Sequence, residues 1–186
     1  MSTSPPPAVS ISPSLNSDPQ SISQTSTNVH DLWANICIQS FPFPEFVQAE
    51  ESHASTRTAL SHERNSFDCL VVSSCNDTLP GDSEYIPIFV VVYKDTNKET
   101  EVGWKNATTQ MLNYCRDSLT GNKRVYGAVA IGTKVRLCCC SYPVAFSSIQ
   151  EDIELNLEDA TDIKALESAL EVIRERGWRW AVSTQT

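Results

Sequence analysis

YIPIFVVVYKD, residues 85–95, is the stretch of sequence that decides the fold. Its middle, Ile88 to Val92, is an unbroken apolar run rich in β-branched residues, and Ile86 precedes it across a proline. That composition is typical of a strand buried on both faces, at the centre of a mixed sheet. Lys94 and Asp95 follow where such a strand would emerge into solvent.

Length and composition limit the number of domains. With 186 residues, 40% of them apolar and 20% charged, the chain can form one domain with a real core. Residues 1–27 are mostly Ser, Pro, Thr, Gln and Asn, a composition that cannot offset the entropy of ordering, so we predict a disordered tail. We therefore expect a single α/β domain over residues 28–180 and a short tail over 181–186.

The formal charge of −9 is unevenly distributed. Residues 41–150 carry 12 acidic and 10 basic side chains, whereas residues 151–186 carry 9 acidic and 4 basic ones. The predicted core is nearly neutral and shows no basic footprint of the kind that nucleic-acid binders present. A protein partner is compatible with this charge; a nucleic-acid partner is possible, but the charge does not support it.

The seven cysteines include an adjacent triplet, Cys138 to Cys140, and no C-x-x-C pair. Neighbours on a strand point to opposite faces, so the triplet cannot be mutually bridged, and we interpret the thiols as small buried hydrophobes in a reducing compartment. No run of apolar residues has the length of a membrane span, and no signal peptide is recognisable. We expect an intracellular protein, cytoplasmic or nuclear, without membrane contact; the oligomeric state is not predicted.

Periodicity predicts the elements before the central strand. Asn28 or Thr27 can cap a helix that must stop by Phe41–Pro44, and a second helix is predicted over Glu45 to Ser52. Residues 53–65 are predicted to be loop or weak helix. Phe67 to Ser73 is predicted as a strand, joined by turn-forming residues to an antiparallel partner at 85–94.

The elements after the central strand are predicted in the same way. Thr100 to Leu119 carries an apolar helical stripe, and residues 125–131 and 135–142 flank a hairpin signal at Gly132-Thr133-Lys134. One or two edge strands are expected within 145–157. A last helix is predicted over Asp162 to Arg176, capped by Asp159 or Thr161 and ended by Gly177, with two tryptophans after it packing on the sheet.

This order of elements resembles the core of the PD-(D/E)xK, or restriction-endonuclease-like, superfamily over roughly residues 33–142. The resemblance rests on an upstream helix with acidic residues, on Asp68 early in the first core strand, on Lys94 at the end of the second, and on Gln110 four residues before Tyr114 in the following helix. It implies a mixed sheet of four to five strands flanked by helices.

In an active member of that superfamily, an aspartate and a glutamate hold Mg²⁺, and a lysine two residues after the glutamate assists at the water or phosphate. By resemblance Asp68 takes the place of the aspartate and Lys94 that of the lysine, while Val92 stands where the glutamate is expected. Asp95, Glu63 or Glu101 are candidate replacement ligands, and Gln110 is a candidate ligand or a positioning residue.

Three hypotheses follow. In the first, the chain is a catalytically degenerate nuclease-like domain that acts as a binding or scaffolding module, with no cofactor. In the second, it is an active Mg²⁺-dependent nuclease with a relocated carboxylate. In the third, it is an unrelated intracellular α/β interaction domain in which Asp68 and Lys94 share no role.

Overall fold

The computed structural model describes residues 28–54, 66–76, 84–119, 124–141, 145–148 and 153–183, without the side chains of 52–54, 66–68, 75, 76, 84 and 145–148. The predicted tail over 1–27 and most of the predicted loop over 53–65 lie outside these residues. The elements in chain order are α1 (Val29–Ser40), β1 (Phe46–Ala54), β2 (Ser66–Asn76), β3 (Glu84–Lys94), the 3-10 turn η1 (Thr96–Lys98), α2 (Glu101–Ser118), β4 (Arg124–Ile131), β5 (Lys134–Ser141), β6 (Ala145–Ser148), β7 (Glu154–Asn156) and α3 (Ala160–Val182).

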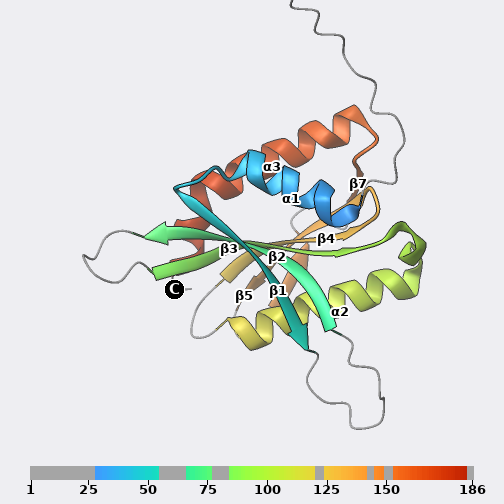
Figure 1. Ribbon diagram of the computed structural model, residues 1–186, viewed down its shortest axis with the longest axis horizontal. Coiled ribbons are helices and arrows are strands. Elements are labelled where there is room, and N and C mark those ends of the chain that lie inside the picture. Colours follow the sequence, from blue (N-terminus) through green and yellow to red (C-terminus); the bar gives the residue numbers. More distant parts are fainter. Residues whose placement is uncertain are drawn as a thin grey trace, which may run out of the picture.

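The strands form one mixed sheet in the order β1-β2-β3-β4-β5-β6, with β7 also paired to β5 (Figure 1). β1, β2 and β3 are antiparallel neighbours, β3 and β4 are parallel and joined through α2, and β4 and β5 form an antiparallel hairpin. The predicted α/β class and mixed sheet are confirmed. Within the described residues the sheet has seven strands, more than the four to five expected.

The prediction of a helix over residues 45–52 is wrong, because these residues form β1. β1 pairs with β2 from Phe46 opposite Ser74 to Ala54 opposite Ser66. Phe46 is buried, and its ring meets that of Phe41 with the centroids 5.4 Å apart. Glu, Gln and Ala favour a helix locally, but the backbone hydrogen bonds of an available sheet edge override that preference.

Helices cover both faces of the sheet, α1 and α3 on one and α2 on the other (Figure 1). β3 lies between the two layers. Residues 88 to 92 of β3 are all fully buried, with Phe89 and Val91 in the cluster under α1 and α3, and Val90 and Val92 in the cluster under α2. The prediction of a central strand buried on both faces is therefore confirmed.

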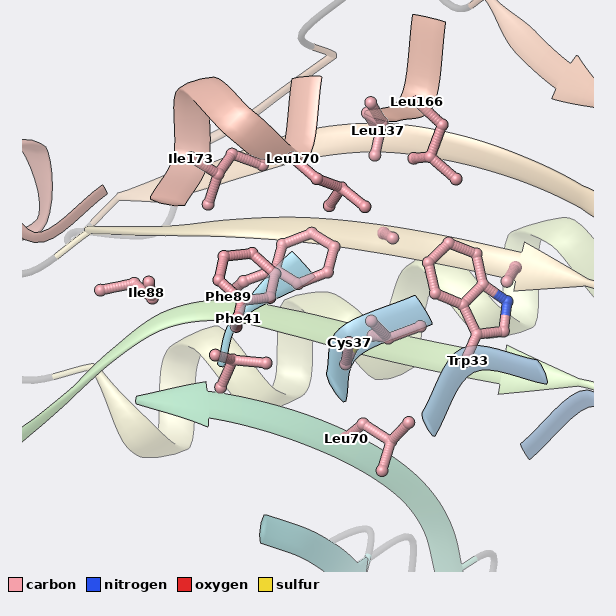
Figure 2. Packing of buried hydrophobic residues seen from close by; sticks show 14 of the residues in the cluster. Trp33, Cys37, Phe41, Leu70, Ile88, Phe89, Leu137, Leu166, Leu170 and Ile173 are labelled. Atoms are coloured by element: carbon pink, nitrogen blue, oxygen red, sulfur yellow. The ribbon is translucent and has the colours of Figure 1, made fainter. Parts of the chain in front are cut away.

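The larger cluster fills the space between the sheet and the α1/α3 layer. Figure 2 shows Phe41, the residue after α1, beside Phe89 of β3, with Cys37 and then Trp33 of α1 further along the cluster. Leu166, Leu170 and Ile173 of α3 lie on its other side. Trp33 is fully buried. Burial of such apolar surface is what holds both helices to the sheet.

Two helices start at the predicted caps. Asn28 accepts a hydrogen bond from the backbone N–H of His30 at 3.1 Å, and Asp159 accepts one from Thr161 at 2.7 Å. Thr100, predicted as the first residue of a helix, caps α2 instead and accepts from Gly103 at 3.0 Å. The last prediction of this kind, a helix end at Gly177, is wrong because α3 continues to Val182.

Gly177 has a packing role instead of a terminating one. A Cβ at this position would lie 3.4 Å from the Cβ of Ile88, so the glycine lets α3 approach β3 closely. The helix then continues across the sheet, with Ala181 buried and Trp180 stacked on Tyr126 of β4 at a centroid distance of 4.2 Å. The predicted packing of the two tryptophans on the sheet is confirmed, since Trp178 also contacts the core.

Six of the seven cysteines have described side chains, and all six are free; five of them are buried, namely Cys37, Cys69, Cys115, Cys138 and Cys140. Desolvation raises the pKa of Cys37 to about 12, which keeps this thiol protonated. Their placement agrees with the interpretation of the thiols as small core residues. None of the described helices combines the length and the apolar composition that a membrane crossing requires.

Candidate functional site: a lysine and amide pocket at the end of the central strand

A pocket of about 360 Å³ lies where β3 ends and α2 passes beneath it. Its walls are formed by Lys94, the last residue of β3, by Lys98 of η1, and by one side of α2: Gly103, Asn106, Thr109, Gln110 and Asn113. The structure thus brings together two residues that the sequence singled out, Lys94 and Gln110. Two ammonium groups and three amide side chains face the same small space.

Local backbone contacts explain why the pocket forms here. The carbonyl of Lys94 accepts a hydrogen bond of 2.9 Å from Gly132, which ties the end of β3 to the β4–β5 hairpin. Gly132 has φ of +59°, a conformation that glycine adopts without strain. A Cβ on Gly103 would overlap the carbonyl oxygen of Lys98, so this glycine allows η1 to fold back onto the start of α2.

Gln110 offers an unmet acceptor. Its Oε1 is buried and has no hydrogen-bond partner within the described part of the chain. A buried polar atom without a partner carries a free-energy cost, and such atoms in native proteins usually meet a water or a ligand. The pocket can therefore supply positive charge from its lysines and hydrogen-bonding groups from its amides to one bound molecule.

Val92 occupies the position at which the resemblance expects a glutamate. It is fully buried, pairs with Cys69 of β2 on one side and Val129 of β4 on the other, and packs among residues under α2. An apolar side chain provides no oxygen for Mg²⁺, which binds through carboxylates and water. The donor set that the resemblance implies is incomplete at this position.

The strand register separates positions 68 and 94. Asp68 lies in β2 next to Cys69, which pairs with Val92, and Lys94 lies two residues beyond Val92. Since alternate residues of a strand belong to opposite faces, position 94 falls on the α2 face and position 68 on the α1/α3 face. The side chain of Asp68 is outside the described residues, so a joint role with Lys94 stays a prediction, one that the register does not favour.

The candidate replacement ligands do not line the pocket. Asp95 is exposed at the start of η1, and Glu101 is exposed in the first turn of α2 beside a different hollow lined by Trp104 and Arg136. Glu63 lies outside the described residues. Among the residues that the structure describes, no group of three His, Cys, Asp or Glu side chains is placed to hold a metal ion.

Sequence reasoning missed Glu51. This residue pairs with Cys69, so that Glu51, Cys69 and Val92 form a row across three strands on the α2 face. The thiol of Cys69 donates to the carbonyl of Glu51 at 3.6 Å. Burial raises the pKa of Tyr114, and the negative charge of Glu51 raises it further, which places this carboxylate near α2. Once residues 45–52 are interpreted as helix, no pattern in the sequence points to Glu51.

Comparison of the chain with protein-family models, with curated proteins and with solved structures gives no match in any of the three.

Proposed function

We propose that this chain is a catalytically degenerate PD-(D/E)xK nuclease-like domain that acts as a binding or scaffolding module. One observation carries the proposal: Lys94 and Gln110 line one pocket, while the position of the metal-binding glutamate holds the fully buried Val92. In terms of the resemblance, the lysine and the helix glutamine of a nuclease-like site are kept, whereas its metal-binding glutamate is replaced.

The path of the chain supports the nuclease-like assignment. The resemblance rests on an antiparallel strand pair, a long helix and a second strand pair, and these are β2–β3, α2 and β4–β5. The parallel pairing of β3 with β4 places α2 across one face of the sheet. The third hypothesis, an unrelated α/β interaction domain, also accounts for the meeting of Lys94 and Gln110, because a strand end and the following helix are neighbours in any such fold. It is the alternative that the placement of positions 68 and 94 on opposite faces of the sheet favours.

The pocket suits a ligand that joins an anionic group, such as a phosphate or a carboxylate, to a hydrogen-bond donor. Its lysines and amide NH2 groups can donate to the anionic oxygens, and the unmet Oε1 of Gln110 can accept from the donor. A long polyanion is disfavoured by the net charge of −9, of which −5 lies on residues 151–186. We therefore propose a protein partner in place of a nucleic acid. The free cysteines support an intracellular setting, cytoplasmic or nuclear.

A cleavage assay tests the absence of catalysis. The full-length chain is incubated with labelled single- and double-stranded DNA and RNA in Mg²⁺ or Mn²⁺, beside Asp68→Ala and Lys94→Ala variants. We expect no cleavage above the buffer control with any of the three proteins, and dissociation constants for the same oligonucleotides weaker than about 100 µM at physiological salt. Metal-dependent cleavage that disappears in Asp68→Ala would contradict the proposal.

The second candidate, an active nuclease with a relocated carboxylate, has one observation in its favour: Glu51 lies on the same face of the sheet as Lys94. The described residues do not assemble a magnesium site, so no reaction step is derived from it. We expect millimolar Mg²⁺ to leave the melting temperature unchanged relative to matched ionic strength, because only a ligand of the folded state stabilises it. A rise that Glu51→Gln abolishes would favour this candidate instead.

A further inference from the structure

Three free thiols meet in the apolar layer between α2 and the sheet (Figure 1). Cys115 comes from the last turn of α2, and Cys138 and Cys140 come from β5. The two strand residues are two positions apart and therefore lie on the same face of β5, whereas the half-buried Cys139 between them lies on the other face. All three thiols under α2 are buried. We call them the thiol cluster.

Cys140 is the centre of the thiol cluster. The thiols of Cys115 and Cys138 both donate a hydrogen bond to the sulfur of Cys140. Gly127 of β4 pairs with Cys138, and a Cβ on this glycine would lie only 2.9 Å from the Cys138 sulfur. The absence of a side chain on Gly127 thus makes room for the sulfur atoms to gather under one helix.

The hydrogen bonds within the cluster determine which thiol loses its proton first. The bonds from Cys115 and Cys138 lower the pKa of Cys140 to about 5, because they stabilise its thiolate form. The same bonds raise the pKa of the two donor thiols, which must keep their protons to donate them. Cys37, a buried thiol under α1, shows the contrast, since burial raises its pKa to about 12. The thiolate is the reactive form of cysteine.

We propose that Cys140 and Cys115 are a peroxide-sensitive dithiol, which hydrogen peroxide oxidises to a disulfide between β5 and α2. In the first step the sulfur of Cys140 attacks the peroxide: an S–O bond forms, the O–O bond breaks, and the departing hydroxide takes the thiol proton and leaves as water. In the second step the sulfur of Cys115 attacks the resulting sulfenic acid: the S–S bond forms, the S–O bond breaks, and the hydroxide leaves as a second water with the proton of Cys115. The two thiols lose two electrons, and the peroxide takes up both.

Cys115 is a more suitable partner for Cys140 than Cys138 is. Two strand rises place the Cα atoms of Cys138 and Cys140 about 6.7 Å apart, at the upper limit of about 6.8 Å for a disulfide, and the strand holds them there. Cys115 belongs to a separate element and can approach Cys140 with the end of α2.

The place of the cluster also gives a small oxidant a route to it. α2 ends at Ser118, three residues after Cys115, and Cys140 is the last residue but one of β5. Fraying of the end of the helix exposes the sulfur atoms without unfolding the sheet.

This inference does not rest on the nuclease-like assignment, because no residue of the thiol cluster lines the pocket at Lys94. Metal-dependent cleavage would overturn the proposed function and leave the dithiol unaffected. Failure of the experiment below would overturn only the dithiol.

Peptide mapping of the oxidised protein tests the proposal. The full-length chain is reduced, freed of reductant and treated with hydrogen peroxide, and the remaining thiols are blocked with N-ethylmaleimide. Trypsin separates the two partners, because Cys115 falls in residues 106–116 and the cysteine triplet in residues 137–164. We expect these two peptides to be joined, with the loss of two hydrogen atoms, and to separate again in dithiothreitol. Cys37 should lose its free thiol at least about tenfold more slowly.

Two matched variants identify the residue of the triplet that reacts. Cys140→Ala removes the sulfur that accepts both hydrogen bonds, and Cys139→Ala makes the same change on the opposite face of β5. We expect the first to lower the yield of the joined peptides at least about tenfold and the second to change it less than about twofold. Circular dichroism shows whether each variant is folded, and fragmentation of the joined peptides from the unsubstituted chain identifies the linked cysteine without any variant.

Four outcomes would overturn the inference. They are loss of thiols without joined peptides, a link from Cys115 to Cys138 or Cys139 in place of Cys140, oxidation of Cys37 as fast as that of Cys140, and an equal yield of the joined peptides when peroxide is added in urea. The last would show that the pairing does not depend on the contacts made in the folded protein.

Discussion

Val92→Glu is expected to destabilise the protein by about 3–5 kcal/mol at pH 7, although it restores the Glu-x-Lys spacing of the nuclease motif. Val92 is fully buried between Cys69 and Val129 under α2. A carboxylate there loses its hydration, and its neighbours Cys69 on β2 and Val129 on β4 carry no positive charge that would compensate for the loss. Urea denaturation monitored by circular dichroism measures the change.

The pH dependence of this variant has a definite sign. Burial raises the folded-state pKa of the introduced glutamate above its unfolded value of about 4.3, so the folded state binds the extra proton. The penalty is therefore smallest below about pH 4 and grows as the pH rises through the folded-state pKa. Val92→Thr, which has the same shape and no charge, should cost only about 1–3 kcal/mol with little change across that range.

The same variant reports on ancestry. If Val92→Glu keeps the stability of the parent and gains a magnesium-dependent rise in melting temperature, the site retains room and charge for a metal ion. That result would support the second candidate function, an active nuclease, and the account of Val92 as a core residue would be wrong.

Trp33→Ala should cost about 3–5 kcal/mol, which makes it one of the largest effects open to a single substitution in α1. Trp33 is fully buried between the sheet and the α1/α3 layer, at the end of the cluster opposite to Ile88 in Figure 2. Its truncation leaves a cavity that helices packed on both sides can close only in part. The midpoint of urea denaturation, followed by circular dichroism, measures the loss.

Two control variants show how much of the loss in Trp33→Ala comes from the removed side-chain volume and how much from the removed indole N–H or from any change in α1. The indole N–H of Trp33 is buried and has no hydrogen-bond partner in the described residues, so Trp33→Phe removes that unmet donor together with part of the ring. We expect it to cost less than about 1.5 kcal/mol. Ile38→Ala on the same helix, at a position 60% exposed, should stay within about 0.5 kcal/mol. A small effect of Trp33→Ala would show that α1 contributes little to the core.

Local signals were sufficient for most of the fold. The apolar run of residues 88–92 identified the central strand, Gly132-Thr133 identified the β4–β5 hairpin, and the stripe after Thr100 identified α2. Each of these elements carries its own signature within a few residues. One or two edge strands were expected within 145–157, and β6 and β7 lie there.

The failures came from information that is not local. β1 is rich in helix-forming residues, and it becomes a strand because β2 offers a partner some 20 residues later in the chain. Gly177 has the residue type of a helix end, but the side chain of Ile88 on β3 decides its role. No window of sequence around either position contains its partner.

The candidate site divides in the same way. Lys94 and Gln110 were placed together because a strand end and the following helix are neighbours in the chain as well as in space. The place of Glu51 on the α2 face was not predicted, because it follows only from the register of β1 on β2 and of β2 on β3. The register also sets positions 68 and 94 on different faces, which no spacing within the sequence reveals.

The position of β3 between two helix layers has a consequence for biosynthesis. Its parallel neighbour β4 and its covering helix α3 are translated after it, and α3 ends only at Val182. At 5–20 residues per second, roughly 4–18 seconds separate the synthesis of Lys94 from that of Val182. During that time the most hydrophobic strand of the nascent chain lacks its native cover on at least one side, which makes it a natural substrate for ribosome-associated chaperones.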